Sequence, residues 1–79
     1  MAIEAYVFVS TTGPGPAAAC QAIRHLPGVV RADALLGEPP VVAIIEAEGF
    51  AALDLVIDRI RSLPAVAETD THVVRAVDD

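Results

Sequence analysis

Alternating apolar side chains predict four strands in this chain. In residues 3–10, every second position from Ile3 to Val9 is apolar, and Tyr6 and Phe8 make the opposite face apolar as well. A strand with two apolar faces is typical of a central strand that is covered on both sides. The same alternation predicts three further strands, over residues 29–36, 41–48 and 65–77. The third of the four is the most apolar and is therefore also expected in the interior of the sheet.

Helical periodicity separates these strands in two places. Residues 16–26 place Ala19, Ile23 and Leu26 on one face, and Pro16 suits the first turn of a helix, which has no use for its N–H. The second segment covers residues 50–62, follows Gly49, and carries the stripe Phe50, Leu53, Val56, Ile57 and Ile60. Leu55 in this segment lies off the apolar stripe, so it is either an exposed apolar residue or part of an interface.

A four-residue motif occurs twice, 37 positions apart, as Leu26-Pro27-Gly28-Val29 and Leu63-Pro64-Ala65-Val66. Each copy closes a predicted helix, because proline disfavours helical geometry in the residue before it, and opens a predicted strand. Residues 1–36 and 41–77 are therefore two strand–helix–strand halves built on one plan. With right-handed crossovers they give an α+β, ferredoxin-like βαββαβ fold, in which a four-stranded antiparallel sheet has both helices on one face.

No part of the chain is left over to cover the second face of that sheet. The 79 residues make one domain, 1–79, yet 54% of them are hydrophobic, which is high for so short a chain. The uncovered face is expected to carry Tyr6, Phe8, Val42 and Ile44, or the alternate residues of the same strands, an apolar patch too large for a monomer. The sequence therefore predicts a homodimer that meets sheet face to sheet face or edge to edge.

Charge and cysteine content exclude several classes of protein. The net charge is −6 and the five basic residues are scattered arginines, so direct nucleic-acid binding is not expected. The longest uncharged apolar run, Val41 to Ile45, is far shorter than the roughly 20 residues of a membrane span, and the N-terminus does not resemble a signal peptide. The single cysteine, Cys20, excludes an internal disulfide and a multi-cysteine metal site. We therefore expect a cytoplasmic protein with no cofactor and no membrane contact.

Several short motifs occur in an order that resembles one family. An apolar first strand precedes the loop Gly13-Pro14-Gly15-Pro16, the motif Leu26-Pro27-Gly28-Val29 and the turn that Gly37-Glu38 opens. The motif Ser62-Leu63-Pro64-Ala65-Val66 and then Thr69-Asp70-Thr71 complete the series. Over essentially its whole length the chain resembles the effector-binding (regulation of amino-acid metabolism, RAM) domain of the Lrp/AsnC, or feast/famine, transcriptional regulators.

The resemblance implies a non-enzymatic regulatory module. Such domains pair through their sheets, and the dimers often assemble into rings of eight or ten subunits, with a small effector, commonly an amino acid, between neighbouring dimers. Full members also have an N-terminal helix-turn-helix. This chain starts at the first strand, so it resembles a stand-alone version that would co-assemble with a DNA-binding relative and so modulate transcription. The ligand-binding residues that the resemblance implies are Gly37, Glu38, Thr69, Asp70 and Thr71.

The turn after the second strand departs from the family pattern. In the family it reads Gly-acidic-aromatic-Asp, and the Asp helps to hold polar groups of the effector, whereas Pro39 and Pro40 occupy the last two positions here. Proline provides neither a carboxylate nor a backbone N–H. Glu38, one position away, and the hydroxyls of Thr69 and Thr71 are the candidates to replace those contacts.

Two other functions stay open as alternatives. Small enzymes of the dimeric α+β barrel type, such as monooxygenases, also pair ferredoxin-like sheets around a cavity, where Tyr6 and His72 would be the candidate residues. An ACT-like domain, an amino-acid-sensing accessory subunit, shares the strand order.

Two clusters of chemically active residues have simpler explanations. Asp70 and His72 share a strand face with Glu68, but alternate residues of a strand stand about 6.5 Å apart, so a solvated sheet face is favoured over a metal site. Cys20 and His25 lie about 140° apart around a helix, which disfavours a nucleophile pair.

Overall fold

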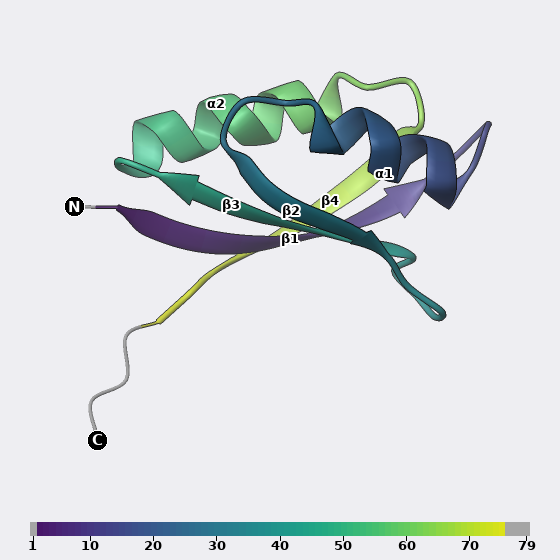
Figure 1. The fold of residues 1–79 in the computed structure, drawn as a ribbon, viewed down its shortest axis with the longest axis horizontal. Helices are drawn as coiled ribbons and strands as arrows, with labels where there is room; N and C mark the ends of the chain where they lie inside the picture. Colours follow the sequence, from purple (N-terminus) through teal and green to yellow (C-terminus); the bar gives the residue numbers. More distant parts are fainter. Residues whose placement is uncertain (1, 76–79) are drawn as a thin grey trace.

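The computed structural model describes residues 2–75, and its elements follow one another in the predicted order (Figure 1). They are β1 (Ile3–Thr11), α1 (Pro16–Arg24), β2 (Val29–Ala34), β3 (Val41–Ala47), α2 (Phe50–Arg61) and β4 (Val66–Val73). The predicted βαββαβ arrangement is confirmed. None of the described helices is long and apolar enough to cross a membrane.

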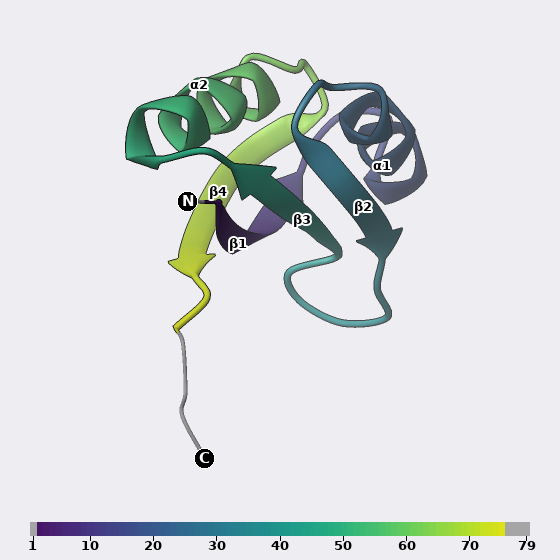
Figure 2. The same ribbon diagram turned by 60° about the vertical axis from the view of Figure 1, so that its left-hand side comes forward.

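The four strands form one antiparallel sheet in the order β2-β3-β1-β4. β1 pairs with β3 on one side and with β4 on the other, and β2 pairs with the free edge of β3. Both helices lie on the same side of this sheet, as Figures 1 and 2 show from two directions. The two strands predicted to be interior, β1 and β3, are indeed the central ones.

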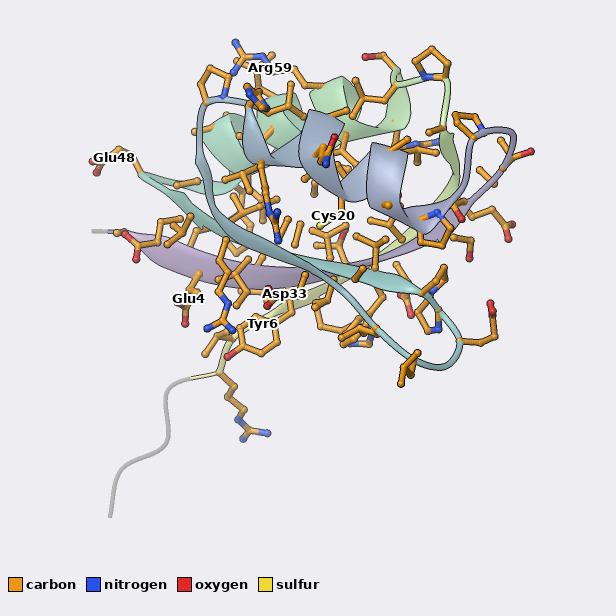
Figure 3. The ribbon with its side chains drawn as sticks, turned by 45° about the vertical axis from the view of Figure 1, so that its right-hand side comes forward. Glu4, Tyr6, Cys20, Asp33, Glu48 and Arg59 are labelled. Carbon is orange, nitrogen blue, oxygen red and sulfur yellow. The ribbon has the colours of Figure 1, made fainter. Side chains whose placement is uncertain are left out.

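The hydrophobic core lies between this helical layer and the sheet. Alternate residues of β1 and β3 point into it, and Ile23 of α1 and Ile60 of α2 close it from above, each without any exposed surface. Cys20 is buried in the same layer (Figure 3), whereas His25 is exposed and hydrogen-bonds the carbonyl of Gln21. The two do not form a pair, as their helical spacing predicted.

Four details of the prediction were wrong at the ends of elements. Phe50 is 66% exposed, because helical side chains tilt towards the N-terminus and that of the first residue of α2 points past the end of the core. β2 ends at Ala34, so Leu36 is completely exposed in the following loop. α1 ends at Arg24, and Leu26 belongs to the turn after it.

The fourth detail is the extent of the last strand, which ends at Val73. Residue 77, its predicted end, lies outside the described residues.

An irregularity between Val29 and Arg31 also changes the register of β2, so that Val29 packs against the core and Val30 is exposed. Strict alternation along residues 29–36 would put Val30 on the same face as the buried Ala32, and a bulge is the usual reason for such a change.

The repeated Leu-Pro motif forms a turn with the same closing hydrogen bond in both halves, but with a different backbone at its third residue. The N–H of Val29 donates to the carbonyl of Leu26, and the N–H of Val66 donates to that of Leu63. The first turn has Gly28 at φ +93°, as the third residue of a type II turn requires, while the second is built with Ala65, which has no positive φ. A Cβ atom on Gly28 would lie 2.7 Å from Cγ2 of Val56 in α2. Gly28 therefore lets the turn after α1 approach α2 closely.

This close approach makes the substitution Gly28→Ala strongly destabilising. We expect it to lower the free energy of unfolding by about 2–4 kcal/mol, because it adds backbone strain to a steric conflict with Val56. Urea or thermal unfolding measures the change. Gly13→Ala is the matched control, since Gly13 also has a positive φ (+60°) but open space around it, and should cost only about 1 kcal/mol. Equal losses in the two variants would contradict the role given to the Val56 contact.

Candidate functional site

The sheet face away from the helices carries the apolar residues predicted for an interface. Tyr6 lies opposite Ile44 in the β1–β3 ladder, and Phe8 lies opposite Val42. Tyr6 is 41% exposed and the other three are partly buried. Figure 3 shows Tyr6 on the side of the sheet that the helices leave open. We call this surface the open face, and these four residues the apolar block.

A hollow of about 490 Å³ lies on the open face, where β1 ends and β4 begins. The loop between β2 and β3 supplies one wall, and Figures 1 and 2 show this loop bending away from the helices. The loop is closed at its base by a hydrogen bond from the N–H of Leu35 to the carbonyl of Pro40. The residue Pro40 is buried. The residues that line the hollow are Phe8, Ser10, Glu38, Pro39, Glu68, Thr69 and Asp70.

The strand register explains why distant residues meet there. Phe8 lies opposite Asp70, and Ser10 lies opposite Glu68, so both pairs project from the open face of the β1–β4 ladder. Glu38 is added from the loop. The residues that line the hollow thus include three acidic residues, the hydroxyl-bearing Ser10 and the aromatic Phe8, and none of the described lining residues is basic.

His72 connects this hollow to the apolar block. Its Nε2 donates a hydrogen bond to Oδ2 of Asp70 over 3.1 Å, and its ring meets that of Phe8 edge to face, with centroids 5.7 Å apart. His72 also lies opposite Tyr6 in the ladder, although neither of these two residues lines the hollow. The open face is therefore one continuous surface that runs from the apolar block to the acidic hollow.

A second, smaller hollow of about 250 Å³ adjoins the first and shares two of its residues. It is lined by Arg61, Ala67, Glu68 and Thr69. Arg61 is the last residue of α2, so this basic side chain comes from the helical side of the molecule.

Comparison with known proteins identifies the family. The model of the Lrp/AsnC ligand binding domain matches residues 4–76. The chain belongs to this family. Domains of this family are regulatory ligand-binding domains of transcription regulators. A comparison with curated proteins finds no match.

Solved structures agree with that assignment. The protein TTHA0845 of Thermus thermophilus superposes with a TM-score of 0.87 at 28% identity, over 98% of both chains. Escherichia coli AsnC gives a TM-score of 0.83 at 16% identity, over 95% of this chain and 52% of that one. A feast or famine regulatory protein of M. tuberculosis complexed with L-methionine gives 0.79 at 22% identity, over 95% and 51%. The last two likenesses concern the Lrp/AsnC domain fold alone.

Of the ligand-binding residues predicted from the sequence, the structure brings three into the hollow: Glu38, Thr69 and Asp70. Gly37 is exposed in the loop and is not part of the lining. Thr71 points to the opposite side of the sheet, because it lies opposite the buried Val7. By the same alternation Thr69 lies on the side of Thr71, but it still contributes to the lining of the hollow at the sheet edge.

The prediction of ligand-binding residues missed Phe8, Ser10, Pro39 and Glu68, although it placed Phe8 in the interface. Glu68 had a signal, since it shares a strand face with Asp70. No sequence signal pointed to Ser10 or Pro39, because the position of the loop over the end of β1 depends on tertiary structure. Within the described residues, no three His, Cys, Asp or Glu side chains are arranged to hold a metal ion.

The presence of three acidic residues around the hollow of this Lrp/AsnC domain leads to a stability prediction. Glu38→Gln should raise the melting temperature by about 1–4 °C at low salt, because one of three like charges around the hollow is removed. The gain should disappear in about 0.5 M salt, where exposed charges are screened. Differential scanning calorimetry at the two salt concentrations measures it. A loss of stability at low salt would show that Glu38 has a favourable partner instead.

Proposed function

We propose that this domain is a non-enzymatic regulatory module that binds a small metabolite, an amino acid, in the acidic hollow and assembles with further copies through the open face. The observation that carries the proposal is that hollow and apolar block share Phe8 on one continuous surface. Membership of a ligand-binding family supports the binding role. The L-methionine complexes of two structures with the same fold support an amino acid as the class of ligand.

The homodimer is proposed because the apolar block has no cover within the described chain. Tyr6, Phe8, Val42 and Ile44 come from the two central strands, and the helices lie on the other side of the sheet. Contiguous exposed apolar surface of this kind marks a site of protein–protein contact. The proposal extends to rings of such dimers, to co-assembly with a DNA-binding Lrp/AsnC relative, and to a cytoplasmic location.

Shared residues provide a way for ligand and assembly to influence each other. A ligand changes an assembly equilibrium only if it binds one state more tightly than the other. A molecule in the hollow would contact Phe8 and Asp70, and His72 contacts both of these from beside the apolar block. Ligand binding would therefore alter side chains at the border of the interface.

The geometry favours this function over a barrel-type enzyme. Tyr6 and His72, the candidate residues of that alternative, do lie opposite each other in the ladder. However, both are exposed, and neither is among the residues that line the hollow.

Binding and assembly can be tested together. Native mass spectrometry and light scattering, with and without a panel of amino acids, should find a dimer whose mass distribution shifts on addition of at least one of them. Calorimetry on the same samples should give a matching binding signal. A strict monomer at all concentrations would contradict the assembly part of the proposal, and the absence of any small-molecule binding would contradict the ligand part.

A charged side chain in the apolar block should break the dimer. Ile44→Lys is expected to raise the dimer dissociation constant by at least about 100-fold, because it buries an unpaired charge at the interface. Ile44 does not line the hollow, so the ligand site stays intact. Leu55→Lys is the matched control, since Leu55 is a 52% exposed residue of α2 on the other side of the sheet. Analytical ultracentrifugation distinguishes the two; a dimeric Ile44→Lys variant would rule out the open face as the interface.

A further inference from the structure

The acidic hollow has more negative charge than the single ammonium group of an ordinary amino acid would balance. Glu38 reaches it from the β2–β3 loop, and Glu68 and Asp70 reach it from alternate positions of β4. None of the seven described lining residues is basic. Positive charge on a ligand would therefore be favoured in this hollow.

Few of these carboxylates are compensated by the protein. Within residues 2–75, neither Glu38 nor Glu68 has a side-chain hydrogen bond or an ion pair, and Asp70 has one, with His72. A chain with a net charge of −6 adds to the negative potential and attracts cations to the site. At least two negative charges in the hollow are therefore available to a ligand.

A single metal ion does not fit this distribution of charge. A metal site needs several oxygen ligands within about 2.6 Å of one point. The described residues contain no group of three acidic, His or Cys side chains arranged in that way. The open hollow, with a volume of about 490 Å³, is large enough to hold a small organic molecule. The charges are thus spread along the hollow rather than focused on one point.

The remaining walls suit an alkyl chain with cationic ends. The Phe8 ring and Pro39 offer apolar surface, and an aromatic face attracts an ammonium or guanidinium group. The hydroxyl of Ser10 is an acceptor for N–H donors. We infer that the occupant of the hollow carries two cationic nitrogen groups on a short alkyl chain, as a basic amino acid or a diamine does. This inference rests on the proposed ligand-binding function and narrows its ligand class.

A basic amino acid and a diamine differ in one group, the carboxylate. The acidic hollow has no basic residue among its described lining to receive it, but Arg61 lines the adjoining hollow, behind the shared residues Glu68 and Thr69. A basic amino acid would direct its carboxylate towards Arg61, whereas a diamine has none to place. Lysine and cadaverine, which is lysine without its carboxylate, therefore distinguish the two sources.

Isothermal titration calorimetry with L-lysine, cadaverine, L-methionine and calcium chloride tests the inference. We expect lysine or cadaverine to bind at least tenfold more tightly than methionine, and this binding to weaken several-fold between about 20 and 500 mM salt, on the order expected for screened charges. Glu68→Gln and Asp70→Asn should each reduce the affinity by about three- to tenfold. If lysine is the ligand, Arg61→Gln should weaken lysine but leave cadaverine unchanged.

Glu48→Gln is the matched control for the loss of one negative charge. Glu48 is exposed and follows β3 at the end away from the β2–β3 loop, as Figure 3 shows, and it does not line the hollow. Its substitution should leave the affinity within about twofold of the original value, on the basis of screening over that distance. Circular dichroism of each variant confirms that the fold is kept. An equal effect of Glu48→Gln would show that net charge, not the hollow, attracts the ligand, and would overturn the inference.

The other outcomes separate this inference from the function it rests on. If methionine binds as tightly as the dications or more tightly, the ligand class is wrong and the regulatory binding function stands. If calcium displaces the dications at comparable concentration, the hollow is a metal site and the inference fails. If no small molecule binds, the proposed function itself fails and the inference with it.

Discussion

The rest of this structure depends on the one-sided cover of its sheet. The central strands β1 and β3 are apolar on both faces, but both helices lie on one side only. Alternate residues such as Val7 and Ile45 are buried by the helices, while Phe8 and Ile44 on the opposite face are covered only in part. No further helix or strand of the described residues forms a third layer over that face. One face of the sheet is therefore buried in the core, and the other keeps exposed apolar surface. This exposed apolar surface is the reason why assembly is part of the proposed function.

Phe8 belongs to both the proposed interface and the proposed ligand site. It is part of the apolar block through its pairing with Val42, and it forms a wall of the acidic hollow. The edge-to-face contact with His72 extends the same surface to Asp70. A side chain shared by an interface and a ligand site transmits binding energy between them without a long pathway through the core. The coupling proposed for this domain thus needs only neighbouring side chains on one face.

Alternation and the repeated Leu-Pro motif were enough to predict the order of the elements, the central strands and the apolar block. These features are local or arise from strand periodicity, which fixes the face of each residue. The prediction was wrong where one residue breaks the period, as at Val29 and Val30, or where a helix begins beyond the core, as at Phe50. The hollow was only partly predictable, because Glu38 and Glu68 stand 30 positions apart and meet through the course of one loop.

The exchange of an aromatic-Asp pair for Pro39 and Pro40 has a different meaning once the site is seen in three dimensions. Read along the sequence, the exchange removes a carboxylate from the turn. In the structure the hollow is still strongly acidic, because Glu68 and Asp70 project into it from β4 and Glu38 remains in the loop. Two of the three charges therefore lie on a strand, where backbone pairing with β1 fixes their positions more tightly than a loop does. Pro39 forms a wall and Pro40 is buried at the base of the loop. In this structure, the loop supplies Pro39 and one acidic residue to the hollow, and the sheet supplies the other two acidic residues.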